Sequence, residues 1–283
     1  MTLTTRRGGR ALAAVLAPHL DRWAQQRAVL GELHSGDLGW HLRFPDERVA
    51  GSVLVWEKDG EPVAAGLLDG QDLLPAVSPE HAASEELAAA MATTSAGLTS
   101  VDASDGTLLR DVLLGQGWTV DPLEWVVLLA DLGPGHATDQ DPGTRELDGP
   151  ADVEARVAVQ RSAFSPGSTF TAALWEQMAS GPTYDRRFDL VTWTPDGRPA
   201  AAATGWFAGP GRTAILEPVG THADHRRQGY GGRVNLAVMA ALARAGASAV
   251  RVHTPASNPA AVGAYESCGL RRVNRTTAVT RTG

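Results

Sequence analysis

The sequence is most informative where an apolar segment runs into a glycine-rich turn, which reads Glu217-Pro218-Val219-Gly220-Thr221-His222-Ala223-Asp224-His225-Arg226-Arg227-Gln228-Gly229-Tyr230-Gly231-Gly232. The residues before the turn predict a strand over 213–221, and Val234, Val238 and Leu242 at four-residue spacing predict a helix over 229–245. Glycines at the start of a helix leave backbone N–H groups uncrowded, and the helix dipole favours negative charge there. With two adjacent arginines, the turn is a candidate diphosphate site.

A second motif lies downstream and reads Asn258-Pro259-Ala260-Ala261-Val262-Gly263-Ala264-Tyr265-Glu266-Ser267-Cys268-Gly269-Leu270. Together the two motifs resemble those of the GCN5-related N-acetyltransferase (GNAT) superfamily. Its pyrophosphate-binding pattern is Arg or Gln, two residues, Gly, one residue, then Gly or Ala, and Arg226, Gly229 and Gly231 fill it. The second motif resembles the superfamily's Asn, Ala, Tyr and Gly-Phe signature, with Leu270 in place of Phe. The resemblance covers about residues 144–283.

The resemblance implies an α+β fold, in which a mixed, mostly antiparallel sheet is flanked by helices. It also implies transfer of an acyl group from acetyl-coenzyme A, which is a co-substrate, to an amine in a ternary complex. The residues that it assigns to binding of the coenzyme are Val219, Gly220, Thr221, Arg226, Arg227, Gln228, Gly229, Tyr230, Gly231, Gly232 and Asn258.

Two side chains are candidates for catalysis. Tyr265 matches the family's general acid, which protonates the departing thiolate, and Glu217 lies where the family often places a base. A base is needed because an amine with a pKa near 10 is mostly protonated in water. His222, Asp224 and His253 are weaker candidates for the base. The alternative interpretations are a packed aromatic at Tyr265 and an exposed carboxylate at Glu217.

The single cysteine, Cys268, cannot form an internal disulfide, which favours a reducing, cytoplasmic location. Nothing beside it indicates a lowered thiol pKa, so we expect a core residue rather than a nucleophile. His136, His222, His225 and His253 show no metal-ligand spacing, and no metal is predicted.

Length and composition limit the number of domains and the possible partners. The chain has 283 residues, 43% of them hydrophobic and 20% charged, which predicts a globular protein of two domains. The net charge of -7 argues against a nucleic-acid partner and mildly favours a cationic acceptor. No segment reaches the about 20 apolar residues of a membrane span, and Arg6, Arg7 and Arg10 precede what we expect to be an amphipathic helix. We expect a monomer or a homodimer.

The two halves of the chain predict the same order of elements. In the first half we expect helices over 11–31, 80–92 and 107–114 and strands over 52–57, 62–68, 98–101 and 124–129. In the second half, the remaining elements are helices over 151–163, 171–180 and 259–268 and strands over 188–194, 200–207, 249–254 and 276–281.

This repetition, and the likeness of residues 104–118 to residues 257–270, favour a tandem duplication. We therefore expect a GNAT-like domain over 1–132, a linker over 133–143 and a catalytic domain over 144–283. In the first domain, residues 77–86 correspond to the glycine turn but contain no glycine or arginine. We expect a degenerate copy that does not bind coenzyme A and closes the acceptor site.

Three functions are compatible with the sequence. The favoured one is an N-acetyltransferase for a primary amine of a small molecule, such as an amino sugar, amino acid, polyamine or antibiotic. The second is a tandem acyltransferase resembling mycothiol synthase, and the third is a catalytically silent acyl-coenzyme A sensor. The stretch Gly36–His41 is unusual for a plain loop and is a candidate for lining the acceptor cleft.

Overall fold

The computed structural model describes residues 2–24, 33–138 and 141–281. The strands are β1 (Leu3–Gly8), β2 (Val53–Lys58), β3 (Glu61–Asp69), β4 (Asp72–Val77), β5 (Ser100–Val101), β6 (Thr119–Asp131), β7 (Thr144–Glu146), β8 (Asp189–Trp193), β9 (Pro199–Trp206), β10 (Thr213–Thr221), β11 (Ala249–Pro255) and β12 (Arg271–Thr280). The α-helices are α1 (Arg10–Trp23), α2 (Ser35–His41), α3 (Asp46–Val49), α4 (Glu85–Thr94), α5 (Leu108–Gly115), α6 (Pro150–Ala163), α7 (Ala172–Ala179), α8 (Tyr230–Arg244) and α9 (Pro259–Ser267). Short 3-10 turns are η1 (Pro79–His81), η2 (Pro134–Thr138), η3 (Arg186–Phe188) and η4 (Ala223–His225).

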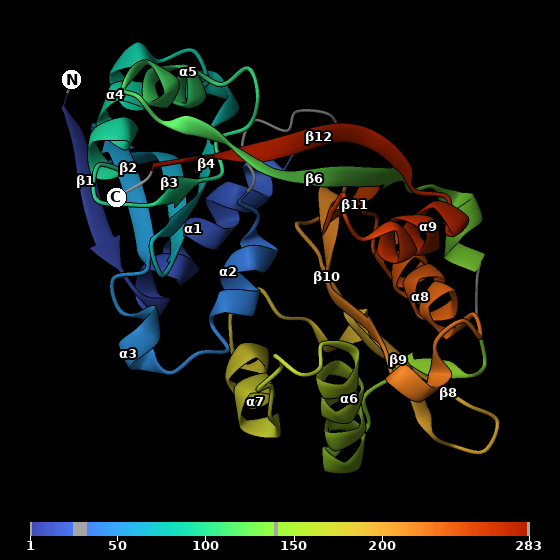
Figure 1. Ribbon diagram of the computed structural model, residues 1–283. Helices are drawn as coiled ribbons and strands as arrows, with labels where there is room; N and C mark the ends of the chain where they lie inside the picture. Colours follow the sequence, from blue (N-terminus) through green and yellow to red (C-terminus); the bar gives the residue numbers. More distant parts are fainter. Residues whose placement is uncertain (1, 25–32, 139–140, 282–283) are drawn as a thin grey trace.

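The twelve strands of the described residues form one continuous sheet, in the order β1-β2-β3-β4-β5-β12-β6-β11-β10-β9-β8-β7. Only the β4–β5 and β10–β11 pairs are parallel among the described strands. The predicted α+β class with a mixed, mostly antiparallel sheet is therefore confirmed. Figure 1 shows the N-terminal half on the left and the C-terminal half on the right, with β6 and β12 running side by side between them.

The last strand of each half pairs with the sheet of the other half. β6 lies against β11 of the C-terminal half, and β12 reaches back to pair with β5 of the N-terminal half. The hydrophobic cores of the two halves also contain residues of these exchanged strands. Val126, Leu128 and Ala130 of β6 pack in the C-terminal core, and Val279 of β12 packs in the N-terminal core. Each half therefore buries apolar side chains that the other half supplies.

The expected repetition of element order is present in the structure. Apart from α3 and the short 3-10 turns, both halves run strand, helix, helix, three strands, helix, strand, helix, strand. The division at residues 133–143 stays a prediction, and part of that segment lies outside the described residues. The structure adds strands β1, β4 and β7 and helices α2 and α3, which the sequence patterns did not predict.

Two predicted helices have different bounds in the structure. The first ends at Trp23, and its predicted continuation to residue 31 lies mostly outside the described residues. The helix expected over 80–92 instead follows η1 and begins at Glu85, because the Ser84 side chain accepts a hydrogen bond from Leu87 N at 3.3 Å and caps it.

Helix α2 of the N-terminal half packs against β9 and β10 of the C-terminal half. A Cβ on Gly36 would lie 2.4 Å from a ring atom of Trp206, so only glycine allows this close approach. His34, which caps α2, places its Nε2 3.0 Å from the carbonyl of Thr213 at the start of β10. Burial lowers the pKa of His34 to about 3, so this contact holds α2 in place through a neutral ring.

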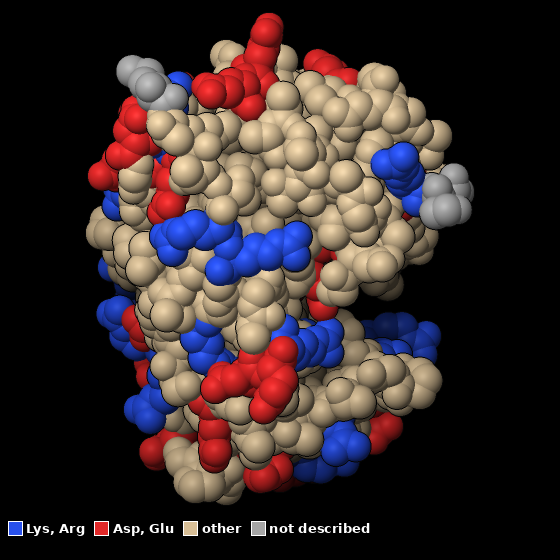
Figure 2. Space-filling view, turned by 90° about the vertical axis from the view of Figure 1, so that its left-hand side faces the viewer, with Lys and Arg blue, Asp and Glu red and all other residues tan. Residues whose placement is uncertain are grey.

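Charges of both signs are interspersed over the face shown in Figure 2, without a continuous basic surface on that face. None of the described helices is long and apolar enough to cross a membrane.

Candidate active site

The two parallel strands of the C-terminal half separate part-way along their length. β10 and β11 pair only from Thr213 to Ile215, opposite Ala249 to Arg251. On its other edge, β10 shifts register against β9 between Leu216 and Val219, which marks a bulge. The separation opens the sheet beside Glu217, where an extended ligand can lie between two strands.

A cavity of about 580 Å³ lies at this opening. Predicted site residues that line it are Glu217, Val219, His253, Asn258 and Tyr265. The N-terminal half contributes Trp40, Arg43, Phe44, Arg48 and Trp125 to the same walls. A smaller cavity of about 200 Å³ adjoins it and shares Glu217, His253 and Trp125, with additional walls from Asp37, Leu74, Asp102 and Arg251.

Glu217 is partly buried and faces both cavities. Desolvation raises the pKa of its carboxyl well above the ordinary value, and the charge of Asp37 and a hydrogen bond with its side chain raise it further. The charge of Arg43 acts in the opposite direction. A hydrogen bond between two carboxyl groups requires that one carries a proton, so Glu217 and Asp37 titrate as a pair. Trp206 Nε1 donates to the Glu217 carbonyl at 2.6 Å and fixes this part of the strand.

Tyr265 projects from α9 and is only 8% exposed. Burial is the largest cause that raises the pKa of its hydroxyl, and the charge of Glu217 raises it as well. The hydroxyl therefore keeps its proton throughout the neutral range and can donate it. Asn258 caps the same helix, because its Oδ1 accepts a hydrogen bond from Ala261 N at 3.1 Å.

The glycine turn lies where β10 leads through η4 into α8. Gly229 is the N-terminal cap with φ at +83°, a conformation that side chains rarely adopt, and no side chain caps this helix end. No acidic residue lies in the first turn of α8, and Arg226 and Arg227 are exposed beside it. The arrangement offers free backbone donors and two cations to an anion.

Of the remaining predicted binding residues, Gly220 and Thr221 lie at the end of β10, and Gln228, Tyr230, Gly231 and Gly232 lie in the turn and at the start of α8. Gly220 packs against α6, where a Cβ would lie 2.7 Å from that of Ala163, and Thr221 Oγ1 would lie 2.8 Å from a Cβ on Gly231. The weaker candidates for the base differ in position. His253 lines both cavities, whereas His222 and Asp224 line neither.

Cys268 is a core residue, as predicted, and its thiol donates to the carbonyl of Gly232 at 3.6 Å. Burial raises the pKa of this thiol, which disfavours the thiolate. Among the described residues, no group of three or more His, Cys, Asp or Glu side chains could hold a metal ion.

Sequence reasoning did not single out several cavity residues of the N-terminal half. It proposed that Gly36–His41 could line the cleft, and the structure makes this stretch part of α2, with Asp37 and Trp40 at the cavity walls. Arg43 and Trp125 were missed. Their proximity to Glu217 depends on the packing of α2 and on the pairing of β6 with β11. No local sequence pattern predicts either of these contacts.

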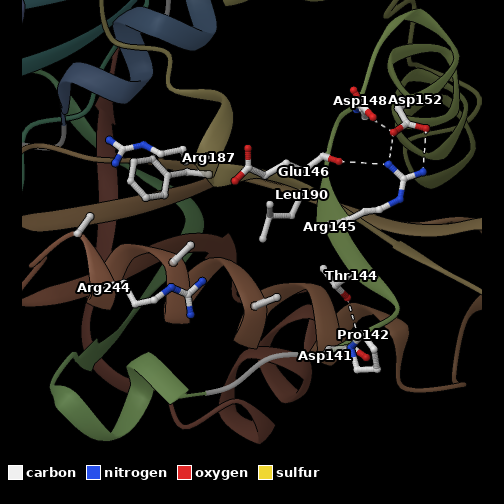
Figure 3. A pocket seen from close by; sticks show the side chains of 14 residues that line it. Asp141, Pro142, Thr144, Arg145, Glu146, Asp148, Asp152, Arg187, Leu190 and Arg244 are labelled. Carbon is white, nitrogen blue, oxygen red and sulfur yellow. Dashed lines mark hydrogen bonds and ion pairs between the residues drawn. The ribbon is translucent and has the colours of Figure 1, made fainter.

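A larger hollow of about 950 Å³ lies between β7, η3 and α8 and is drawn in Figure 3. Arg187 and Arg244 lie on one side of it and Arg145 on the other. Arg145 pairs with Asp152, Arg187 pairs with Asp185 at 2.6 Å, and Arg244 donates to a carbonyl of η2 at 3.1 Å. No predicted catalytic or coenzyme-binding residue lines this hollow.

The comparison with known families identifies the domain around the separated strands. Residues 159–270 match the model of the Acetyltransferase (GNAT) family. Residues 159–270 therefore form a domain of the GNAT family. The resemblance inferred from the two motifs is thus confirmed, and the matched residues contain both the glycine turn and the α9 motif. GNAT proteins are acetyltransferases, so the domain belongs to a family whose activity is acyl-coenzyme A-dependent acetyl transfer. No curated protein matches the chain.

Solved GNAT structures are similar to the whole chain. A GCN5-related N-acetyltransferase from Sphaerobacter thermophilus is 18% identical, with a TM-score of 0.61 over 99% of this chain and 95% of that one. A GNAT acetyltransferase from Colwellia psychrerythraea is 16% identical, with a TM-score of 0.63 over 100% of both chains. A tandem GNAT protein from the clavulanic acid biosynthesis pathway is 14% identical, with a TM-score of 0.58 over 99% and 98%. At these identities the similarity shows the fold.

Proposed function

We propose that this protein is an N-acetyltransferase that transfers the acetyl group of acetyl-coenzyme A directly to a primary amine of a small molecule. The observation that carries this proposal is the placement of Glu217 and Tyr265 on one cavity, at the point where β10 and β11 separate. The diphosphate of the donor would lie at the start of α8, against Gly229, Arg226 and Arg227. Its pantetheine arm would lie between the strands, near Asn258.

Glu217 is proposed as the base. An ammonium must lose a proton before its nitrogen attacks the thioester, and a carboxylate with a raised pKa accepts that proton more readily than an ordinary one. Asp37 contributes to the raised pKa, so the N-terminal half would tune the base of the C-terminal half.

Backbone N–H groups between Val219 and Thr221 would stabilise the oxyanion that forms when nitrogen attacks the carbonyl carbon. When the carbon–sulfur bond breaks, the Tyr265 hydroxyl would give its proton to the leaving thiolate. Its raised pKa keeps that proton available at neutral pH. Positioning of both substrates in the cavity would supply much of the rate.

The N-terminal half is proposed to be a degenerate copy without its own donor site. The segment from β4 to α4 contains no glycine or arginine, and Glu85 and Glu86 lie in the first turn of α4. Two carboxylates there would repel a diphosphate. Trp40, Arg43 and Trp125 would instead close the acceptor side of the active site.

The proposal is tested by release of free thiol from acetyl-coenzyme A in the presence of a panel of amines, with the acetylated product identified by mass. Thiol release that requires an amine, and that Cys268→Ala leaves unchanged, is expected for direct transfer. An acetyl group on the protein that Cys268→Ala abolishes would contradict the direct mechanism. Binding of acetyl-coenzyme A without transfer to any amine would favour a sensor.

A further inference from the structure

The active-site cavity has a basic wall formed by Arg43 and Arg48 of the N-terminal half. Arg43 is half-buried, and its guanidinium lies 3.8 Å from the ring centroid of Trp40 and 4.0 Å from that of Phe44. Its Nη1 donates to the Trp40 carbonyl at 2.6 Å. These contacts fix the side chain without using all five of its N–H donors.

The two arginines differ in how their charges are balanced. Arg48 forms an ion pair with Asp69 at 2.9 Å. Arg43 forms no ion pair within the part of the chain that the structure describes, although Glu217 and Asp69 attract it from a greater distance. Desolvation lowers the pKa of Arg43 to about 10, as expected for a charge removed from water without a close counterion. Such a group favours binding of an anion.

We propose that Arg43 binds an anionic group of the acceptor, so that the acceptor is a small amine that also carries a carboxylate or a phosphate. The inference rests on the proposed function, because it places the amine of the same molecule at Glu217. Guanidinium groups bind both kinds of oxyanion through two parallel N–H donors.

The anionic groups of the donor do not account for this wall. The site proposed for its diphosphate is at the start of α8, beside Arg226 and Arg227, and these residues do not line the cavity. The acetyl group and the amide-linked pantetheine arm, which would occupy the cavity, carry no charge. An anion at Arg43 would therefore come from the acceptor.

This assignment narrows the acceptor class. An amino acid or an amino phosphate would place its ammonium near Glu217 and its anion near Arg43, both of which line one cavity. A polyamine would place a second cation beside Arg43, and repulsion would weaken its binding. Among the acceptor classes compatible with the sequence, the cavity thus favours amino acids over polyamines.

The test uses the full-length protein and matched pairs of amines with and without an anion. The pairs are β-alanine with propylamine, γ-aminobutyrate with butylamine, and O-phosphoethanolamine with ethanolamine. Two readouts are independent of each other: kcat/KM for thiol release, and calorimetric Kd for each amine in the presence of saturating coenzyme A. The variants are Arg43→Gln and Arg43→Lys, with Arg198→Gln as control, because Arg198 is exposed in the β8–β9 turn and lines neither cavity.

We expect the anionic member of at least one pair to be preferred by about 10-fold or more in wild type. Arg43→Gln should remove the preference through KM or Kd, Arg43→Lys should keep part of it, and Arg198→Gln should keep all of it. The carboxylate and phosphate pairs distinguish the two sources of the anion. Equal use or equal binding of both members of every pair would overturn the inference, as would a preference that survives in Arg43→Gln.

The two proposals can fail separately. Turnover of uncharged and anionic amines without discrimination would overturn the anion site and leave the acetyltransferase function standing. A preference in Kd that Arg43→Gln abolishes, without turnover of any amine, would support the anion site and count against catalysis.

Discussion

The two halves of this protein share an order of elements but differ at the start of the helix after the third central strand and at the positions of the two proposed catalytic side chains. Where β10 enters α8, the C-terminal half has Gly229 as an uncapped helix start with two arginines beside it. Where β4 enters α4, the N-terminal half has Ser84 as a capping side chain, followed by two glutamates. The fold is thus kept in both halves, while the helix start that corresponds to the proposed phosphate site is closed in the N-terminal half by a cap and by negative charge.

The proposed catalytic side chains of the C-terminal half are also replaced in the N-terminal half. Leu74 precedes Pro75 in β4 as Glu217 precedes Pro218 in β10. Leu113 takes the place of Tyr265. Its carbonyl accepts a hydrogen bond from the N–H of Trp118, which follows Gly117, as the Tyr265 carbonyl does from the residue that follows Gly269. Leu113 is fully buried. Positions with a proposed chemical role in the C-terminal half therefore hold apolar side chains in the N-terminal half.

Separating the halves should have the largest effect. Fragments 1–132 and 133–283 would each lose a strand that completes their sheet, and exposed strand edges promote aggregation. We expect neither fragment to unfold cooperatively alone and the two to form a 1:1 complex when co-expressed. Circular dichroism melting and size-exclusion chromatography measure both properties. Two soluble fragments with their own cooperative transitions would show that the strand exchange is not needed for folding.

Glu217→Gln should lower kcat/KM about 100-fold or more, because the amide cannot accept the proton of the ammonium. Acetyl-coenzyme A affinity should change little. The matched control in the other half is Glu85→Gln, an exposed residue at the start of α4, which should leave kcat/KM unchanged. Steady-state thiol release measures both variants. Wild-type rates in Glu217→Gln would remove Glu217 from the mechanism.

Tyr265→Phe should lower kcat about 10-fold or more and leave KM for the amine nearly unchanged, because a proton donor to the thiolate is lost and no ground-state contact is. Tyr184→Phe is the matched control. The Tyr184 hydroxyl donates to buried Asp189 at 3.1 Å, so its loss should lower the melting temperature without lowering kcat. Unchanged kcat in Tyr265→Phe would favour a packing role for Tyr265.

Asp37→Asn should lower the maximal rate less than the substitutions of Glu217 and Tyr265 do. It should also shift the pH dependence of kcat/KM. Asp37 raises the pKa of Glu217, so removing its charge lowers that pKa. The ionised base then persists to lower pH, and the acid limb of the kcat/KM profile should move to lower pH. A limb that stays in place while the rate falls would indicate that Asp37 only supports the packing of α2.

The residues of the proposed donor site could be singled out from local patterns because they are close together in the chain. The glycine turn and the α9 motif each fall within a single strand–helix connection. β4 was missed because it is short and contains Pro75, which lacks the N–H donor expected inside a strand. The start of α4 was predicted at residue 80 instead of Glu85, because residues 79–81 form η1 and Ser84 provides the cap.

The acceptor side could not be predicted in the same way. Asp37 and Arg43 reach Glu217 only because Gly36 lets α2 pack against Trp206. Trp125 reaches the cavity because β6 pairs with β11 instead of staying in the sheet of its own half. Contacts of this kind depend on tertiary packing between residues that are far apart in the sequence.

We propose that the chain binds one acetyl-coenzyme A, at the start of α8. Calorimetric titration of acetyl-coenzyme A into wild type, into the double variant Arg226→Glu/Gly229→Asp, and into Ala83→Asp tests it most directly. Ala83 is exposed just before the Ser84 cap, so Ala83→Asp places a single new carboxylate in the corresponding turn of the N-terminal half, as Gly229→Asp does in the C-terminal half. We expect one site per chain, which the double variant abolishes and Ala83→Asp keeps. Binding that survives the double variant, or that Ala83→Asp abolishes, would contradict it.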